Sequence, residues 1–296
     1  MANKLDLKVS FSFMKCRLYF ILLFSVIQYS FFAQNYNLKV ELIDNMIKAI
    51  DNHNQLEFKM YRNERSKNGF TDGKFYAKLN NKPYKLYIKN FKPKPGSEIL
   101  YIKGQNDDKA LINPNSFPYF SISLDPDNSI LLAGGHHSVR EAGFALFSNM
   151  FKLYKKNYGE ELYNRITYHG MFKWNNRVCY KISIDYPDYS TKKYTPKNGE
   201  TLYSISRDKL LNIGKLREYN EKYDDDEILD ENDIIIIQSV YAKKAVVFID
   251  KLNYFPIYQL IYDEEGLYEK YQYDDLNLDV NFKNEEFTRD YSEYNF

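Results

Sequence analysis

The sequence predicts an α+β protein: a large curved antiparallel sheet, or open β-barrel, covered by two helices and carrying a small inserted βααβ module. Three observations lead to this fold class. Apolar and polar residues alternate with period two through many short segments, which is typical of strands with one buried face. Two segments instead show the apolar spacing of amphipathic helices. A third region, between two of the later strands, follows the order strand, short helix, short helix, strand.

Composition and charge exclude one class of partner. The chain has 41 basic and 40 acidic residues, a formal net charge of +1, and no long basic run. Nucleic-acid-binding domains carry a basic patch or stripe, so no nucleic acid partner is predicted. The 29 Tyr and 21 Phe residues suit sheets whose cross-strand pairs are aromatic.

The first 33 residues predict an N-terminal extension followed by a secretory signal peptide. A short basic head at 14–17 precedes an apolar run at 18–32 and the small residue Ala33. The run is shorter than the about 20 residues that a bilayer span needs, although an uncleaved anchor stays open as an alternative. The pattern favours Met14 over Met1 as the initiator. It predicts export across the inner membrane to the periplasm or cell envelope.

In chain order, the first predicted elements are a helix and a strand-rich block. Apolar residues at 38, 42, 43, 46, 47 and 50 predict a helix over 38–50, and a first strand follows at 56–60. Residues 69–114 then predict a meander of four strands, with apolar residues on one face and lysines on a wet opposite face. The Pro-, Gly- and Asn-containing stretches between these strands predict turns.

The second helix is predicted after an irregular apolar loop at 116–133. Ser138 and Glu141 have the spacing of a capping box, and the following stripe of apolar residues predicts a helix from 139 to about 158. The stripe is expected to pack on the sheet. The alternative is that part of it forms the rim of an apolar cavity and contacts a ligand. The rim residues would be Phe144, Phe147, Met150 and Phe151.

The later strands are predicted at 166–172, 178–185, 245–250, 258–262, 267–273 and 278–282, with a hairpin turn at 263–266. Cys179 lies on the second of these strands and is the only cysteine left once the signal peptide is removed. A lone strand thiol without a basic or histidine partner is expected to be inert.

Residues 193–238 resemble the LysM module. The residues that carry the resemblance are Tyr194, Gly199, Glu200, Thr201, Leu202, Ser204, Ile205, Leu216, Asn220 and the closing run 235–237. Independently of the family, Thr201 is placed to cap a helix and Asn220 to tie a turn.

LysM modules bind N-acetylglucosamine glycans, peptidoglycan included, in a shallow groove. The resemblance implies that this groove is lined by the loops 199–202 and 223–229. The sequence departs from the LysM pattern at Pro196, Asn232 and Gln238, and its second loop is strongly acidic. A structural insert that keeps only the fold therefore stays open. The implied groove residues are Gly199, Glu200, Thr201, Leu202, Ile228 and Leu229.

The remainder, residues 34–192 and 239–296, resembles an uncharacterised family of exported Gram-negative proteins near the LolA/LolB-like lipoprotein carriers. This resemblance implies an unclosed antiparallel barrel with helices over its mouth and a hydrophobic cavity able to hold acyl chains. The residues that carry it are 82–85, Gly96, Glu98, Tyr101, 104–106, Ala110, 113–114 and the stretch from His136 and His137 to Phe144.

Catalytic and metal-binding motifs receive little support. His136 and His137 with Glu141 could ligate a metal, but adjacent residues rarely point together, so the sequence favours polar residues that shape a loop. No nucleophile elbow, His-Glu-x-x-His motif or phosphate-binding glycine loop is found. We therefore expect no metal, no cofactor and no enzyme activity.

Two functions from different classes are compatible with these patterns. The first is a non-catalytic envelope protein, at most peripheral to the membrane, that binds a lipid or lipoprotein acyl chain in the open barrel. The alternative is a peptidoglycan-binding protein that acts through the LysM-like insert. A hydrolase acting on wall glycans is a third, weaker hypothesis.

Overall fold

The computed structural model describes residues 34–117, 119–132 and 135–296, so the predicted signal peptide lies outside the described residues. The chain divides into two compact units, Met1–Asp44 and Asn45–Phe296, and a helix over residues 34–52 crosses this boundary. The second unit contains every strand of the described residues. No helix among the described residues is long and apolar enough to span a membrane.

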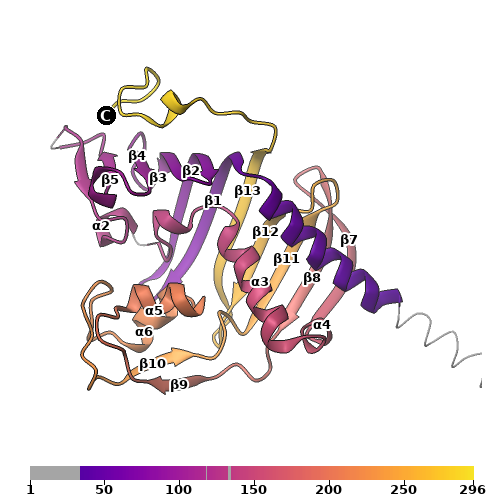
Figure 1. Ribbon diagram of the computed structural model, residues 1–296. Helices are drawn as coiled ribbons and strands as arrows, with labels where there is room; N and C mark the ends of the chain where they lie inside the picture. The colour runs from indigo at the N-terminus through magenta and orange to yellow at the C-terminus, as the bar shows by residue number, and fades with distance from the viewer. Residues whose placement is uncertain (1–33, 118, 133–134) are drawn as a thin grey trace, which may run out of the picture. The chain divides into compact units, whose positions relative to one another are not determined.

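A sheet of eleven strands forms the body of the second unit, and every neighbouring pair of strands is antiparallel (Figure 1). Its two edge strands, β6 and β7, are not paired with each other in the described residues, so the sheet is not closed. This confirms the predicted fold class. In spatial order the strands are β6 (Ile122–Leu124), β5 (Ala110–Asn113), β4 (Glu98–Ile102), β3 (Tyr84–Lys92), β2 (Gly69–Asn81), β1 (Gln55–Ser66), β13 (Leu267–Asn277), β12 (Pro256–Tyr262), β11 (Lys244–Asp250), β8 (Arg177–Asp185) and β7 (Ile166–Trp174).

The inner face of the sheet is covered by α3 (Ala145–Tyr158) (Figure 1). The contact is anchored by Phe144, which is 1% exposed and packs edge-on against Phe58 of β1 and Phe255. Ser148 and Lys152 of α3 also hydrogen-bond Asp51 in the last turn of the first helix, at 3.0 and 2.7 Å. The shorter helical elements outside the insert are η1 (Asn106–Asp108), α2 (Ser129–Leu132), η2 (Val139–Glu141), α4 (Glu161–Asn164) and η3 (Asn284–Phe287).

The predicted continuous helix over 139–158 is wrong, because the chain forms the short helix η2 and then turns before α3. At the turn Gly143 has φ +91°, and a Cβ there would lie 2.5 Å from a methyl group of Leu79. The predicted capping box is also wrong. Ser138 accepts from the amide of Arg140, while the Glu141 carboxylate bonds His137 instead of reaching back to Ser138.

The lysine-bearing face of the meander is covered in part, at Lys78, because the last fifteen residues cross it there, whereas Lys74 is exposed as predicted. The predicted strand at 278–282 is absent, and this segment is extended chain that leads to η3. There Phe287 is buried with Tyr87 and Leu100 in a small second core. Lys78 is consequently 7% exposed, pairs with Glu286 at 2.7 Å and lies over the rings of two tyrosines, Tyr291 and Tyr294.

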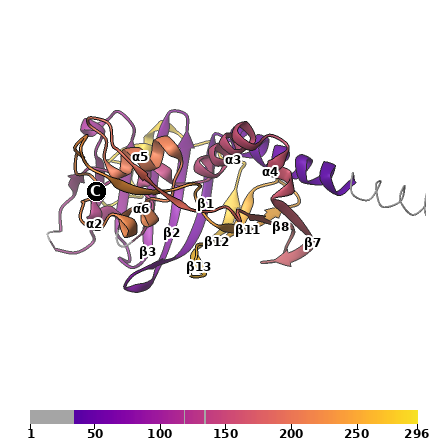
Figure 2. The ribbon, with the colours of Figure 1, turned by 90° about the horizontal axis from the view of Figure 1, so that it is seen from below.

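The inserted module leaves the sheet after β8 and returns to it at β11, and its own two strands pair only with each other among the described strands. Thr201 caps its first helix by accepting from the amide of Ser204, as predicted. Asn220 ties the end of the second helix to β10 by accepting from the amide of Ile236 at 2.8 Å, also as predicted. The elements are β9 (Thr191–Tyr194), α5 (Leu202–Lys209), α6 (Ile213–Tyr219) and β10 (Ile235–Gln238). Figure 2 shows this module beside β1–β3.

Candidate functional site

The candidate site is a partly open cavity of about 190 Å³ on the inner face of the sheet. Strands β1–β6, α3 and the segment around η2 all contribute to its wall. Most of the lining is apolar, because alternate residues of each strand point to this face. The apolar lining includes Met60, Phe75, Ile88, Ile99, Ile112, Ile122, Leu131, Leu132, Val139, Leu146, Phe147, Met150, Ile261 and Tyr273.

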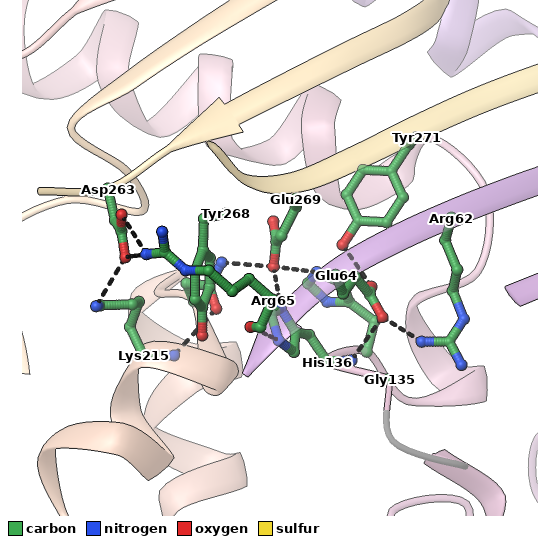
Figure 3. Close-up of polar contacts among 12 residues, drawn as sticks. Arg62, Glu64, Arg65, Gly135, His136, Lys215, Asp263, Tyr268, Glu269 and Tyr271 are labelled. Carbon is green, nitrogen blue, oxygen red and sulfur yellow. Dashed lines mark hydrogen bonds and ion pairs between the residues drawn. The ribbon is translucent and has the colours of Figure 1, made fainter. Parts of the chain in front are cut away.

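A buried group of charged side chains lies in one part of the same lining. Arg62 and Glu64 of β1 form an ion pair, and Tyr271 of β13 donates to the other oxygen of Glu64 at 2.7 Å (Figure 3). The Glu64 side chain is 1% exposed. Its burial opposes ionisation, but the charges of Arg62, His136 and His137 and the hydrogen bond from Tyr271 outweigh burial and lower the pKa of Glu64 to about 2.

His137 supplies a second cation to this lining. Its Nδ1 lies 2.8 Å from Oε2 of Glu141, and its Nε2 lies 2.8 Å from the hydroxyl of Tyr241. That hydroxyl donates to Glu269, so its oxygen is free to accept from the ring. Burial would lower the pKa of His137, but Glu141, with Glu269 and Glu64 behind it, raises that pKa to about 9.

Glu269 joins the cavity to the inserted module. Its carboxylate is fully buried and accepts from Nδ1 of His136 at 2.6 Å and from the side-chain amide of Asn212 at 2.8 Å. The other ring nitrogen of His136 faces the carbonyl of Arg65 at 3.0 Å, so both nitrogens of this ring face acceptors (Figure 3). One buried carboxylate of the sheet therefore holds a residue of the loop and a residue of the insert.

An outer group of charges completes this junction (Figure 3). Asp263 accepts from Arg65 at 2.7 Å and from Lys215 of α6 at 3.0 Å. Tyr268 donates to Glu218 of α6 at 3.0 Å. Gly214 fits closely here, since a Cβ at this position would lie 2.7 Å from the Tyr268 hydroxyl. The insert is thus fastened to the sheet by polar contacts that need close approach of α6.

Stability is expected to fall as pH rises from 6.5 to about 9. The pKa of His137 is raised from 6.5 to about 9 in the folded protein, so its contribution is complete below 6.5 and is lost as pH rises through 9. A shift of this size corresponds to roughly 3 kcal/mol. Urea unfolding at a series of pH values should show this decline, and His137→Gln should flatten it. A decline of equal steepness in the variant would contradict the assignment.

The four predicted rim residues divide into two pairs. Phe147 and Met150 line the cavity, and their contact with a ligand stays a prediction. Phe144 and Phe151 are buried and are not part of the lining. Phe144 packs between the sheet and α3, which is the position expected for the stripe as a whole, and the turn at Gly143 directs it there.

The predicted glycan-groove residues lie on two loops that meet. The amide of Leu229 donates to the carbonyl of Glu200 at 2.9 Å, which places the two loops side by side. Ile228 is 71% exposed beside this contact. Leu202 and Leu229 have their side chains in the core of the insert, so only their backbone is available to a ligand. Gly199 is exposed, Glu200 bonds Tyr194 and the amide of Lys197, and Thr201 caps α5.

His136 and His137 have their ring nitrogens directed at carboxylates, a hydroxyl and a carbonyl. Among the described residues, no group of three or more His, Cys, Asp or Glu side chains is placed to hold a metal ion. Cys179 is fully buried, and burial together with the charge of Asp250 raises the pKa of its thiol to about 11. The buried thiol of Cys179 agrees with the inert role that the sequence favoured for it.

Sequence reasoning missed the charged part of the lining. Arg62 and Glu64 lie on the inner face of β1, beyond the predicted end of that strand at residue 60. Tyr271 of the lining, and Glu269 outside it, belong to a strand for which the sequence predicted only the alternation of apolar and polar residues. One feature of the sequence indicates the polar part of β1. Polar residues continue the alternating positions of β1 beyond Met60, which is compatible with a strand whose inner face becomes polar.

Two segments of the chain match known protein families. Residues 53–213, more than half of the chain, match the family described as "Protein of unknown function (DUF1571)". The chain belongs to the DUF1571 family. The DUF1571 segment contains Arg62, Glu64, His136 and His137, whereas Glu269 lies beyond it. Residues 194–238 match the LysM domain, which confirms that predicted resemblance. No curated protein matches the sequence.

Solved structures similar to this DUF1571 protein include lipoprotein LppX of Mycobacterium tuberculosis and a LolA superfamily protein of Nitrosomonas europaea. The first is 11% identical, with 83% of this chain and 99% of LppX covered and a TM-score of 0.39. The second is 10% identical, with 85% and 97% covered and a TM-score of 0.33. The resemblance to LolA-like proteins is thereby found again among solved structures.

Proposed function

We propose that this protein is a non-catalytic binding protein of the periplasm or cell envelope that holds an alkyl chain, from a lipid or a lipoprotein, in the cavity of the sheet. The observation that carries the proposal is the lining. Apolar side chains from eight strands, α2 and α3 face a space of about 190 Å³. An apolar cavity of about 150 Å³ is already large enough to bind benzene. A short alkyl chain therefore matches the space in size and in polarity.

A series of neutral 1-alkanols tests the proposal. Each buried CH₂ group is worth about 0.8 kcal/mol, so affinity measured by calorimetry should rise about fourfold per carbon until the cavity is full, and then level off. Met150→Trp should weaken binding at least tenfold, because the larger ring occupies the cavity.

The matched control for Met150→Trp is Leu252→Trp. Leu252 is 89% exposed and lies outside the lining, so the added ring should leave alkanol affinity unchanged. Thermal unfolding of both variants establishes that they are folded. If no alkanol binds the unaltered protein at any chain length, the proposal fails.

A second candidate function is glycan binding by the LysM domain. The specific observation in its favour is the pairing of the two groove loops through Leu229 and Glu200, with Ile228 exposed beside the pair. An exposed isoleucine next to two loop backbones provides an apolar surface that can pack against the face of a sugar ring.

Sedimentation with purified peptidoglycan tests this second function. Ile228→Ser should weaken the affinity for peptidoglycan about tenfold, because burial of an isoleucine side chain is worth roughly 1.5–3 kcal/mol. Leu252→Ser, on the sheet domain, is the control and should bind as the unaltered protein does. Equal retention of both variants would remove Ile228 from the site, and absence of sedimentation altogether would remove glycan binding.

A further inference from the structure

The cavity lining contains more positive charge than its own carboxylates can balance. Its cationic side chains are Arg62, Lys92, Lys94 and His137, and its carboxylates are Glu64 and Glu141. Each carboxylate already has a cation of the same set as its partner: Glu64 pairs with Arg62 and Glu141 with His137. Lys92 and Lys94 are the two cations left over.

These two lysines lie at the solvent side of the cavity. Lys92, Pro93 and Lys94 are exposed and at the same time line the cavity, whereas Arg62 and Glu64 are largely buried. No ion pair joins Lys92 or Lys94 to a carboxylate among the described residues. The turn that carries them is anchored at its base, where Asn115 donates to the carbonyl of Pro95 at 3.0 Å and Asn90 to the hydroxyl of Ser97 at 3.0 Å.

The apolar wall continues directly inward from this turn. Ile88 and Ile99 are paired neighbours on β3 and β4, and Ile112 is paired with Ile99 in turn. All three line the cavity and are nearly fully buried. A molecule with its chain against these isoleucines would have its other end beside Lys92 and Lys94.

We infer that the ligand of this cavity is an anionic amphiphile, whose alkyl chain occupies the apolar part and whose carboxylate or phosphate group is bound by Lys92 and Lys94 at the mouth. The inference rests on the proposed function and specifies the class of ligand. A carboxylate or a phosphate group is the complement of two ammonium groups. Arg62 pairs with Glu64 and His137 with Glu141, so no unpaired charge of these groups faces the far end of the alkyl chain.

Four ligands with one chain length test the inference: octanoate, octyl phosphate, 1-octanol and octylamine, each titrated by calorimetry at low salt, near neutral pH and below its aggregation concentration. Octanoate and octyl phosphate are expected to bind about five- to tenfold more tightly than 1-octanol, and octylamine more weakly than 1-octanol. Added salt should reduce this advantage, because both lysines are exposed. The ratio between octyl phosphate and octanoate distinguishes a phospholipid-type headgroup from a fatty-acid carboxylate.

The double variant Lys92→Gln/Lys94→Gln should bind octanoate and 1-octanol with equal affinity. The matched control Lys103→Gln/Lys251→Gln removes two exposed lysines outside the lining and should keep the preference for the anions. Equal binding of octanoate and 1-octanol to the unaltered protein, or a preference that persists in the Lys92/Lys94 variant, overturns the inference and leaves the proposed function standing. Failure of all four ligands to bind overturns both.

Discussion

Replacement of Glu269 by alanine is expected to lower the free energy of unfolding by about 3–5 kcal/mol. The carboxylate is fully buried and accepts from His136 at 2.6 Å, Asn212 at 2.8 Å and Tyr241 at 3.0 Å. Its removal leaves three donors without their acceptor, and one of them is an imidazole ring placed to donate from both nitrogens. Unpaired buried donors and charges are among the costliest defects in a folded protein.

Urea unfolding of Glu269→Ala beside Glu265→Ala measures this effect. The Glu265 side chain is 78% exposed and belongs to the turn just before Glu269, so its loss should change stability by less than about 0.5 kcal/mol. Because Asn212 is in the insert, the Glu269 variant should also release the module from the sheet, with faster proteolysis of α5 and α6. Similar stabilities for the two variants would show that Glu269 does not hold the junction.

Replacement of Phe144 by alanine is the second change with a large expected effect, a loss of about 3–5 kcal/mol. The ring is 1% exposed, with its centroid 4.9 Å from that of Phe255 and 4.2 Å from that of Tyr273. Truncation removes this burial and leaves a cavity between the sheet and the start of α3. The backbone there is constrained by Gly143 against Leu79, so the site has little freedom to collapse.

Phe117→Ala is the control for this second change. Phe117 is 84% exposed, so the same truncation should cost less than about 0.5 kcal/mol. Guanidinium unfolding should give equal slopes for both variants, with the midpoint displaced only for Phe144→Ala. An equally small loss for both would mean that Phe144 contacts ligand space instead of the core, in line with the alternative that part of the helical stripe forms a cavity rim.

The alternation of residues 69–114 was sufficient to predict the meander, because strand formation along one ribbon depends on neighbours that are close in sequence. Each turn carries residues suited to it, and the observed pairing of β2, β3, β4 and β5 follows the chain order. The same holds for the insert, whose caps at Thr201 and Asn220 act over short separations along the chain. Its signature residues specified a LysM domain, whose core contains residues of the insert together with Leu132.

The junction could not be predicted from the sequence in the same way. His136 and Glu269 are 133 residues apart, and their contact depends on the order of strands in the sheet and on the return of the chain after the insert. A histidine and a glutamate that far apart in the sequence form no pattern that indicates a contact. Polar residues at 62–64 also ended the predicted first strand early, because a buried charge pair has the same sequence appearance as a solvated strand end.

Local periodicity and capping were enough to specify the class of the fold, the amphipathic faces of its strands and the position of the inserted module. Which faces became buried depended on the packing of distant segments. The last fifteen residues cover Lys78, and the turn at Gly143 takes Phe144 out of the cavity wall. The same packing leaves a cavity, with Lys92 and Lys94 at its mouth. Unfilled volume and unbalanced charge are properties of side chains brought together from distant segments, and no single segment contains them.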